Sequence, residues 1–267
     1  TRLGPQTPDS RLPTPDSRLS HPLAVNQRQR LNSAMEAPST PESLPATSEA
    51  QRLLTLELLI GLLTAAAALG LVTWLGREVL EGEVLAFDER VRALVHGLAS
   101  PGLTSLMRAA SVYGGPGVLI PAGLVAAAAF LIRGWRRGAL LVVVTLAGAG
   151  LLNGLLKFSF ARVRPASFFD YPLPVSPSFP SGHALYAASI FGGLAVLLTA
   201  RVRNRFLQVA IWLVFLSLTL LVGISRVYLG VHYPSDVLAG YAIGVIWVTT
   251  VAFGDRLARH RRRRRST

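Results

Sequence analysis

Residues 206–236 read FLQVAIWLVFLSLTLLVGISRVYLGVHYPSD, an apolar run that ends in a polar cluster. The run, 206–224, carries no charged side chain and has about the ~20 residues that an α-helix needs to cross a bilayer. The cluster that follows contains Arg226, His232 and Asp236. We therefore expect a fold built from spanning helices that carry chemically active side chains at one end.

The composition of the whole chain also points to a bilayer. Its 267 residues are 51% hydrophobic and 15% charged, whereas soluble domains carry about 25% charged residues. The formal net charge of +13 is compatible with nucleic-acid binding, but the basic residues separate apolar runs, which argues against a nucleic-acid partner. There is no cysteine, so disulfides, thiolate nucleophiles and cysteine-based zinc sites are excluded.

Six apolar stretches follow one another along the chain, most of them near the length of a membrane span. They are 53–76, 112–132, 138–158, 184–200, 206–224 and 237–253. We predict an all-α fold, a bundle of six transmembrane helices. Buried helices of a soluble all-α protein are disfavoured, because six long and nearly uncharged runs leave too little polar surface. Glycines in the third, fourth and sixth stretches predict that these three helices pack closely together.

Three regions are expected along the chain. Residues 1–50 are rich in Pro, Ser, Thr and Gln and repeat the hexapeptide TPDSRL, so we predict a disordered N-terminal tail. Residues 51–255 form the six-helix membrane domain. Residues 256–267 form a polybasic tail, whose run from Arg261 to Arg265 is expected to bind anionic lipid headgroups.

Arginine-rich loops predict the orientation in the membrane. Arginines gather in 133–137, in 201–205 and after the sixth stretch, and positively charged loops stay in the cytoplasm. Both termini are then cytoplasmic, and 77–111, 159–183 and 225–236 face outward. Within 77–111 the apolar positions Val84, Phe87, Val91 and Leu94 recur at helical spacing. They predict either an amphipathic helix on the outer membrane surface or an ordinary connecting helix packed on the bundle.

Three polar clusters fall at the outward ends of the predicted helices. The first is Lys157 with Arg164, the second is Ser181, Gly182 and His183, and the third is Arg226, His232 and Asp236. A phosphate ester is stabilised in its transition state by fixed positive charge, which Lys157, Arg164 and Arg226 can supply. The alternative, that these cations only set topology, predicts them on the cytoplasmic side instead.

The other members of the clusters fit the same chemistry. Ser181 and Gly182 precede an apolar stretch, so they are expected to form an anion site at a helix start, to cap the helix through the serine, or to do both. His232 and Asp236 are four residues apart, which places them on one helix face with the carboxylate near one imidazole nitrogen. The other nitrogen is then free to act as a nucleophile.

Together the three clusters resemble the signature of the type 2 phosphatidic acid phosphatase (PAP2) family, which shares its core with acid phosphatases and vanadium haloperoxidases. The resemblance covers about residues 85–253 and implies a four-helix core of the haloperoxidase kind. It also implies that His232 attacks phosphorus, that His183 protonates the leaving group and that Asp236 orients His232. Lys157, Arg164, Ser181, Gly182 and Arg226 then bind the substrate phosphate, with no metal and no cofactor.

The expected activity is the hydrolysis of a lipid phosphate monoester or diphosphate, of the phosphatidic acid, phosphatidylglycerophosphate or undecaprenyl diphosphate type. A lipid phosphotransferase using the same phosphohistidine stays open, and a non-enzymatic transporter is disfavoured because charged residues lie at one rim. A metal site is disfavoured because the surrounding cations repel a metal ion. Arg162 is either an accessory phosphate contact or a solvated loop residue.

Overall fold

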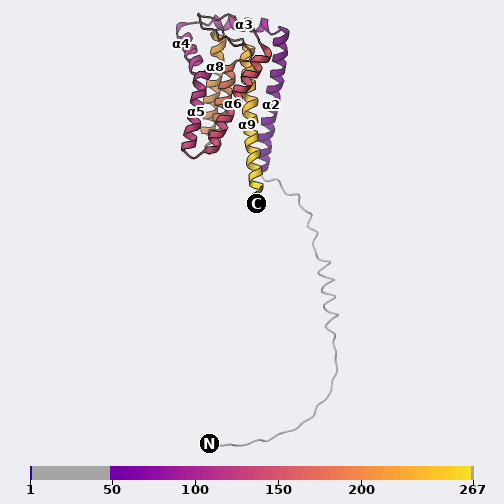
Figure 1. Cartoon of the computed structure of the whole chain (residues 1–267), viewed down its shortest axis with the longest axis vertical. Coiled ribbons are helices and arrows are strands. Elements are labelled where there is room, and N and C mark those ends of the chain that lie inside the picture. Colours follow the sequence, from indigo (N-terminus) through magenta and orange to yellow (C-terminus); the bar gives the residue numbers. More distant parts are fainter. Residues whose placement is uncertain (2–48, 266–267) are drawn as a thin grey trace, which may run out of the picture. The chain divides into compact units, whose positions relative to one another are not determined.

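The computed structural model describes residue 1 and residues 49–265, and the described part of the chain is helical without strands (Figure 1). The helices are α2 (Glu49–Glu81), α3 (Leu85–His96), α4 (Pro101–Tyr113), α5 (Pro116–Ile132), α6 (Arg136–Phe160), α7 (Gly182–Thr199), α8 (Arg205–Tyr228) and α9 (Pro234–Arg265). This confirms the all-α fold. The predicted disordered tail falls almost entirely in 2–48, outside the described residues.

Within the described residues, five helices are long and apolar enough to cross a membrane: α2, α6, α7, α8 and α9. A sixth span arises only if α4 and α5 are counted as one, and these two helices are bent by 50° relative to each other. The structure thus contains the predicted bundle, with its second member broken. The last helix is also longer than predicted, because α9 continues through most of the polybasic segment to Arg265.

The prediction of an uninterrupted helix over 112–132 is wrong at its start. The helix α4 ends at Tyr113, and α5 begins at Pro116, whose ring suits the first turn of a helix. At Gly114 a Cβ atom would lie 2.1 Å from Cγ2 of Val222, so only glycine allows this close approach to α8. The break turns α4 toward the end of α8, where Thr104 and Tyr228 share a hydrogen bond of 2.7 Å.

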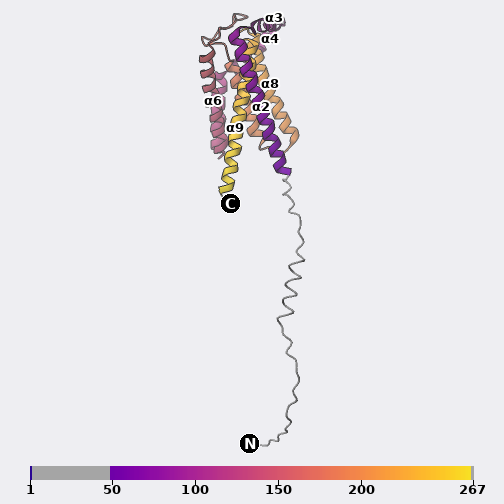
Figure 2. The ribbon, with the colours of Figure 1, turned by 90° about the vertical axis from the view of Figure 1, so that its right-hand side faces the viewer.

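The helix α7 lies at the centre of the bundle and packs against α6, α8 and α9 (Figures 1 and 2). Small residues bring α9 close to it, since a Cβ atom at Gly240 would lie 2.6 Å from the Ser181 carbonyl oxygen and one at Gly244 2.6 Å from Cβ of Ala188. The predicted packing of these glycine-containing helices is confirmed. The helix α2 covers the outside of α9, with Leu75 buried against Phe179 and Ala239.

The helix α3 lies across one end of the bundle, as Figure 1 shows. Its buried side chains are the polar Asp88 and Arg92, whereas Phe87 and Leu94 are exposed. The predicted amphipathic helix is therefore present, but its polar face packs on the protein and its apolar face points away. The alternative of a connecting helix packed on the bundle also holds, since α3 contacts α8 and α9.

Candidate active site

The three predicted clusters meet at the end of the bundle that carries α3. Lys157 lies in the last turn of α6, and Arg226 lies in the last turn of α8. The start of α7 follows Ser181, and the start of α9 supplies Asp236. The segment 161–181 crosses this end between α6 and α7. Antiparallel helices thus bring together residues that lie up to 79 positions apart in the sequence.

His232 and Asp236 form a buried pair. Nδ1 of His232 lies 3.4 Å from Oδ2 of Asp236, and both side chains are almost fully shielded from solvent. The same Oδ2 accepts hydrogen bonds from the backbone N–H of Tyr233 at 2.9 Å and from the Ser178 hydroxyl at 2.5 Å. These donors fix the carboxylate, so that Asp236 can in turn orient the imidazole.

The second imidazole nitrogen of His232 faces the cations. Nη1 of Arg164 lies 3.0 Å from Nε2, and Arg164 is held in place by the carbonyl oxygens of Ser176 at 2.7 Å and Val231 at 2.8 Å. Burial lowers the pKa of His232 to about 4, with Arg164 adding to the effect and Asp236 opposing it. The imidazole is therefore neutral near pH 7, with a lone pair on Nε2.

The three predicted phosphate-binding cations lie within electrostatic reach of one another. The ammonium of Lys157 donates to the carbonyl oxygen of Pro177. The guanidinium of Arg226 is almost fully buried and donates to the Ser111 hydroxyl, while its Nε atom has no partner among the described residues. Burial and the neighbouring Arg226 lower the pKa of Arg164 to about 10. Such a concentration of positive charge favours a bound anion.

Ser181 and Gly182 form the start of α7. The backbone N–H of Ser181 donates to the carbonyl oxygen of Asp236 at 2.9 Å, whereas its buried hydroxyl oxygen has no partner in the described part of the chain. The serine side chain makes no capping bond, so the simple capping interpretation is wrong. A Cβ atom at Gly182 would lie 2.9 Å from Oδ1 of Asn153, so a larger residue there would displace the Asn153 side chain.

His183 lies in the first turn of α7, beside the break between α4 and α5. The positive charges of Arg226, Arg164 and Lys157 act on its imidazole. A Cβ atom added to Gly115 would lie 2.9 Å from Nε2 of His183, so this glycine leaves room for the imidazole. The structure thus brings together every residue predicted for the site.

Arg162 is not a solvated loop residue, because it bridges two buried carboxylates, while its contact with phosphate stays a prediction. Its Nη1 lies 2.7 Å from Asp236 and its Nη2 lies 2.8 Å from Asp88 on α3. Burial disfavours the charged guanidinium, but the two carboxylates outweigh this cost and raise the pKa of Arg162. Its guanidinium also lies 4.1 Å from the centre of the Tyr233 ring. Arg162 thereby ties α3 to the carboxylate that orients His232.

Sequence analysis missed the second half of this network. Asp88 accepts hydrogen bonds from the backbone N–H of Ser235 at 2.9 Å and from its hydroxyl at 2.5 Å. Arg92, one turn further along α3, donates to the carbonyl oxygen of Ala166 at 2.7 Å. Asp88 and Arg92 are four residues apart on the polar face of a predicted amphipathic helix, but this spacing alone does not indicate that the face is buried.

No group of three or more His, Asp or Glu side chains suitable for a metal ion occurs among the described residues. The acidic side chains at the site are instead engaged by arginines and by backbone or hydroxyl donors. Asp88 and Asp236 share Arg162 at 2.8 and 2.7 Å. The donor set of this end of the bundle suits an anion.

Comparison with known proteins agrees with this geometry. A family model for the PAP2 superfamily matches residues 138–257, from α6 into α9. Lipid A 1-phosphatase of Rhizobium etli is 42% identical over 109 residues, which cover 38% of this chain and 43% of that protein. Phosphatidylglycerophosphatase B of Bacillus subtilis is 30% identical over 184 residues, which cover 67% of this chain and 89% of that protein.

A solved structure shows the same arrangement of helices. It is the crystal structure of a transmembrane PAP2 type phosphatidylglycerolphosphate phosphatase from Bacillus subtilis, with a TM-score of 0.65 at 30% identity. The match covers 72% of this chain and 96% of that one. The chain therefore spans less than half of the Rhizobium relative and most of the Bacillus proteins.

Proposed function

The chain belongs to the PAP2 superfamily, and on this basis we propose that it is a multi-pass membrane phosphatase that hydrolyses a lipid phosphate monoester or diphosphate. The observation that carries the proposal is the neutral, buried imidazole of His232, with a carboxylate at one nitrogen and cations at the other. This arrangement suits attack on a phosphorus atom whose oxygens are bound by the same cations.

In the proposed reaction, Nε2 of His232 forms a bond to phosphorus while the bond from phosphorus to the leaving oxygen breaks. His183 gives its proton to that oxygen, which leaves as the lipid alcohol or as a lipid monophosphate. Water then attacks the phosphohistidine, and His183 takes up a proton from this water. Inorganic phosphate is released and His232 is regenerated, so that the net reaction consumes one water molecule.

The remaining residues are proposed to hold the phosphate. Lys157, Arg164 and Arg226 neutralise its oxygens, and the partnerless Nε of Arg226 and hydroxyl of Ser181 are donors available to it. The N–H groups at the start of α7 add the positive end of the helix dipole. Arg164 now contacts Nε2 of His232, and a bound phosphate would draw it away and expose the lone pair. Charge neutralisation by these side chains is the basis for proposing a reaction that needs no metal.

Phosphate release by the purified protein tests this proposal. The substrates are phosphatidic acid, phosphatidylglycerophosphate and undecaprenyl diphosphate, each with and without an acceptor lipid to detect phosphotransfer. We expect release from at least one of them, and loss of release in His232→Gln but not in His96→Gln, whose side chain is exposed on α3. Release that is absent for all three substrates, or equal in the two variants, contradicts the proposed function.

We further propose that the site faces outward and that both termini are cytoplasmic. The arginines between α5 and α6, between α7 and α8 and at the end of α9 lie opposite the site, and such loops stay in the cytoplasm. Val175 is fully exposed at the site end, and Arg133 is exposed at the other. A membrane-impermeant thiol reagent on intact cells should label Val175→Cys and spare Arg133→Cys, and the reverse pattern places the site in the cytoplasm.

A further inference from the structure

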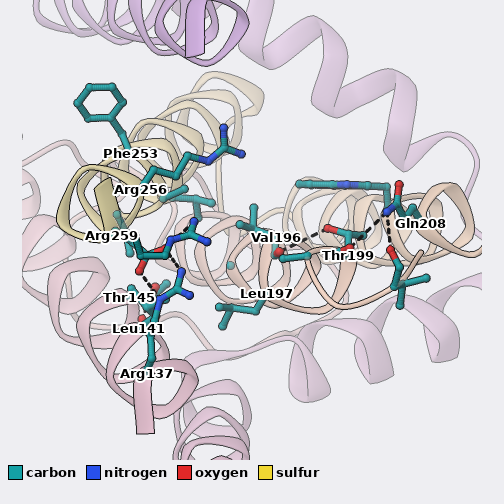
Figure 3. A pocket seen from close by; sticks show the side chains of 18 of the residues that line it. Arg137, Leu141, Thr145, Val196, Leu197, Thr199, Gln208, Phe253, Arg256 and Arg259 are labelled. Atoms are coloured by element: carbon teal, nitrogen blue, oxygen red, sulfur yellow. Dashed lines mark hydrogen bonds and ion pairs between the residues drawn. The ribbon is translucent and has the colours of Figure 1, made fainter. Parts of the chain in front are cut away.

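A large cavity lies at the end of the bundle opposite the candidate active site. Its volume is about 1200 Å³, and its walls come from α6, α7, α8 and α9 (Figure 3). This exceeds the roughly 300–1,000 Å³ of ordinary small-molecule pockets. None of the residues assigned to phosphate chemistry lines it. The cavity therefore needs an occupant of its own.

The rim of the cavity is strongly basic. Among the described residues, its lining contains one acidic side chain, Asp255, and five arginines: Arg137, Arg203, Arg205, Arg256 and Arg259. Arg137 binds both carboxylate oxygens of Asp255, and Arg259 approaches the same group at 3.3 Å. Figure 3 shows Arg137, Arg256 and Arg259 gathered on one side of the cavity. Asp255 is engaged by Arg137 and Arg259, and within the described part of the chain it makes no ion pair with Arg203 or Arg205, which leaves these two guanidinium groups as the positive charge available on the rim.

Arg203 and Arg205 are the arginines of the rim that are best suited to bind a ligand. Both are exposed, and neither has a hydrogen-bond or ion-pair partner within the described residues. They flank Asn204, whose side-chain oxygen accepts from the backbone N–H of Phe206 at 2.9 Å and so fixes the start of α8. Two guanidinium forks on a fixed helix start suit an anion with several oxygens, such as a phosphate.

Behind the basic rim the cavity becomes apolar. Val209 and Trp212 on α8 and Val248 and Val251 on α9 line it. The lining residues Arg259 and Val248 are about 16 Å apart along α9, at a rise of 1.5 Å per residue. The hydrocarbon layer of a bilayer is about 30 Å thick, so the cavity extends well into it. A soluble anion would leave this apolar part unfilled, whereas an acyl chain would fill it.

From this combination we propose that the cavity binds an anionic phospholipid, with its phosphate against Arg203 and Arg205 and an acyl chain between α8 and α9. The site differs from the run Arg261 to Arg265, because it lies within the helix bundle. It is also independent of the proposed phosphatase activity, since it lies at the other end of the spanning helices.

Lipid retention in native mass spectrometry tests the proposal. The full chain is titrated in detergent with phosphatidylglycerol or phosphatidylcholine, and inorganic phosphate and glycerol phosphate serve as soluble competitors. Phosphatidylglycerol is a phosphodiester, so it offers no terminal phosphate to the candidate active site. We expect preferential retention of phosphatidylglycerol, at least about tenfold weaker in Arg203→Gln/Arg205→Gln. Ala252→Trp, which fills the apolar part, should also weaken retention.

The matched control is Arg133→Gln/Arg136→Gln, which removes two exposed arginines at the same end that do not line the cavity. It should change retention by less than about twofold. Equal losses in both double variants mean general attraction to a basic surface and overturn the proposal. Equal retention of phosphatidylcholine, or displacement by millimolar soluble phosphate, overturns it as well. Thermal unfolding of each variant in detergent separates lost binding from lost folding.

Discussion

Replacing Arg162 tests whether the link between α3 and the site positions Asp236. Its guanidinium is only 11% exposed and lies 2.7 and 2.8 Å from two fully buried carboxylates. Removing one partner of a buried ion pair typically costs about 3–5 kcal/mol, because a charge is left without compensation. We therefore expect Arg162→Gln to lower the free energy of unfolding by about that amount. Arg162→Lys should recover part of it, because an ammonium lacks the fork that reaches both carboxylates.

Catalytic activity distinguishes a positioning role of Arg162 from a purely structural one. A misplacement of about 1 Å in a catalytic group can cost roughly 100-fold, so kcat of Arg162→Lys should fall by about 10- to 100-fold with a smaller change in KM. Losing the guanidinium also leaves the charge of Asp236 less neutralised, which should raise the pKa of His232 from about 4 and move the acid limb of kcat/KM upward.

Arg90→Gln is the matched control, since Arg90 is an exposed arginine on α3. It should leave unfolding in detergent, kcat and the acid limb of the pH profile near those of the unmodified protein. If Arg162→Gln matches Arg90→Gln within about twofold in kcat and in its unfolding midpoint, the positioning role of Arg162 is wrong.

Three further predictions concern the site itself. Gly115→Ala should displace the His183 imidazole and lower kcat, because the added Cβ atom would lie 2.9 Å from its Nε2. Gly117→Ala is the control, since a Cβ atom there has open space, and it should leave kcat unchanged. Equal kcat values in the two variants would show that His183 does not depend on the space beside Gly115. Burial lowers the pKa of His232 to about 4, whereas an imidazole in the unfolded chain has a pKa of about 6.5. The stability that the neutral, buried His232 contributes should therefore be complete above about pH 6.5 and be lost as the pH falls toward 4. The acid limb of kcat/KM, corrected for ionisation of the substrate phosphate, should likewise lie near pH 4, and a limb at 6.5 would contradict a buried neutral imidazole. Chelators should leave phosphate release unchanged and vanadate should inhibit it, whereas activity restored only by a divalent ion would refute the metal-free proposal.

Much of this arrangement follows from sequence because each feature depends on local pattern. Apolar length predicts the spanning helices, and the alternation of helix direction predicts that Lys157, His183 and His232 meet at one end. The roles assigned to these residues stay predictions. The break at Gly114 has a local signal that was missed, since Gly114, Gly115 and Pro116 together are typical of a helix boundary. The close approach of Gly114 to Val222 on α8 is tertiary, and nothing in 112–132 alone reveals that neighbour.

The network around Arg162 was also beyond sequence analysis, for a related reason. Asp88 and Asp236 are separated by 148 positions, and only the folded chain shows that one arginine serves both. The apolar spacing of α3 correctly predicted a helix. It gave no sign that the polar face, with Asp88, would be the buried one. A buried charge is expected only where a partner exists, and that partner lies on another segment.

We propose that His232 carries the phosphate during turnover, and trapping the phosphorylated protein tests this role. A lipid substrate labelled in its scissile phosphate is mixed with the protein, the reaction is quenched in alkali, which spares phosphohistidine, and the label is located by peptide mass spectrometry. We expect label on His232 in the unmodified protein and none in His232→Gln. Label on another residue, or steady turnover without any labelled intermediate, would contradict it.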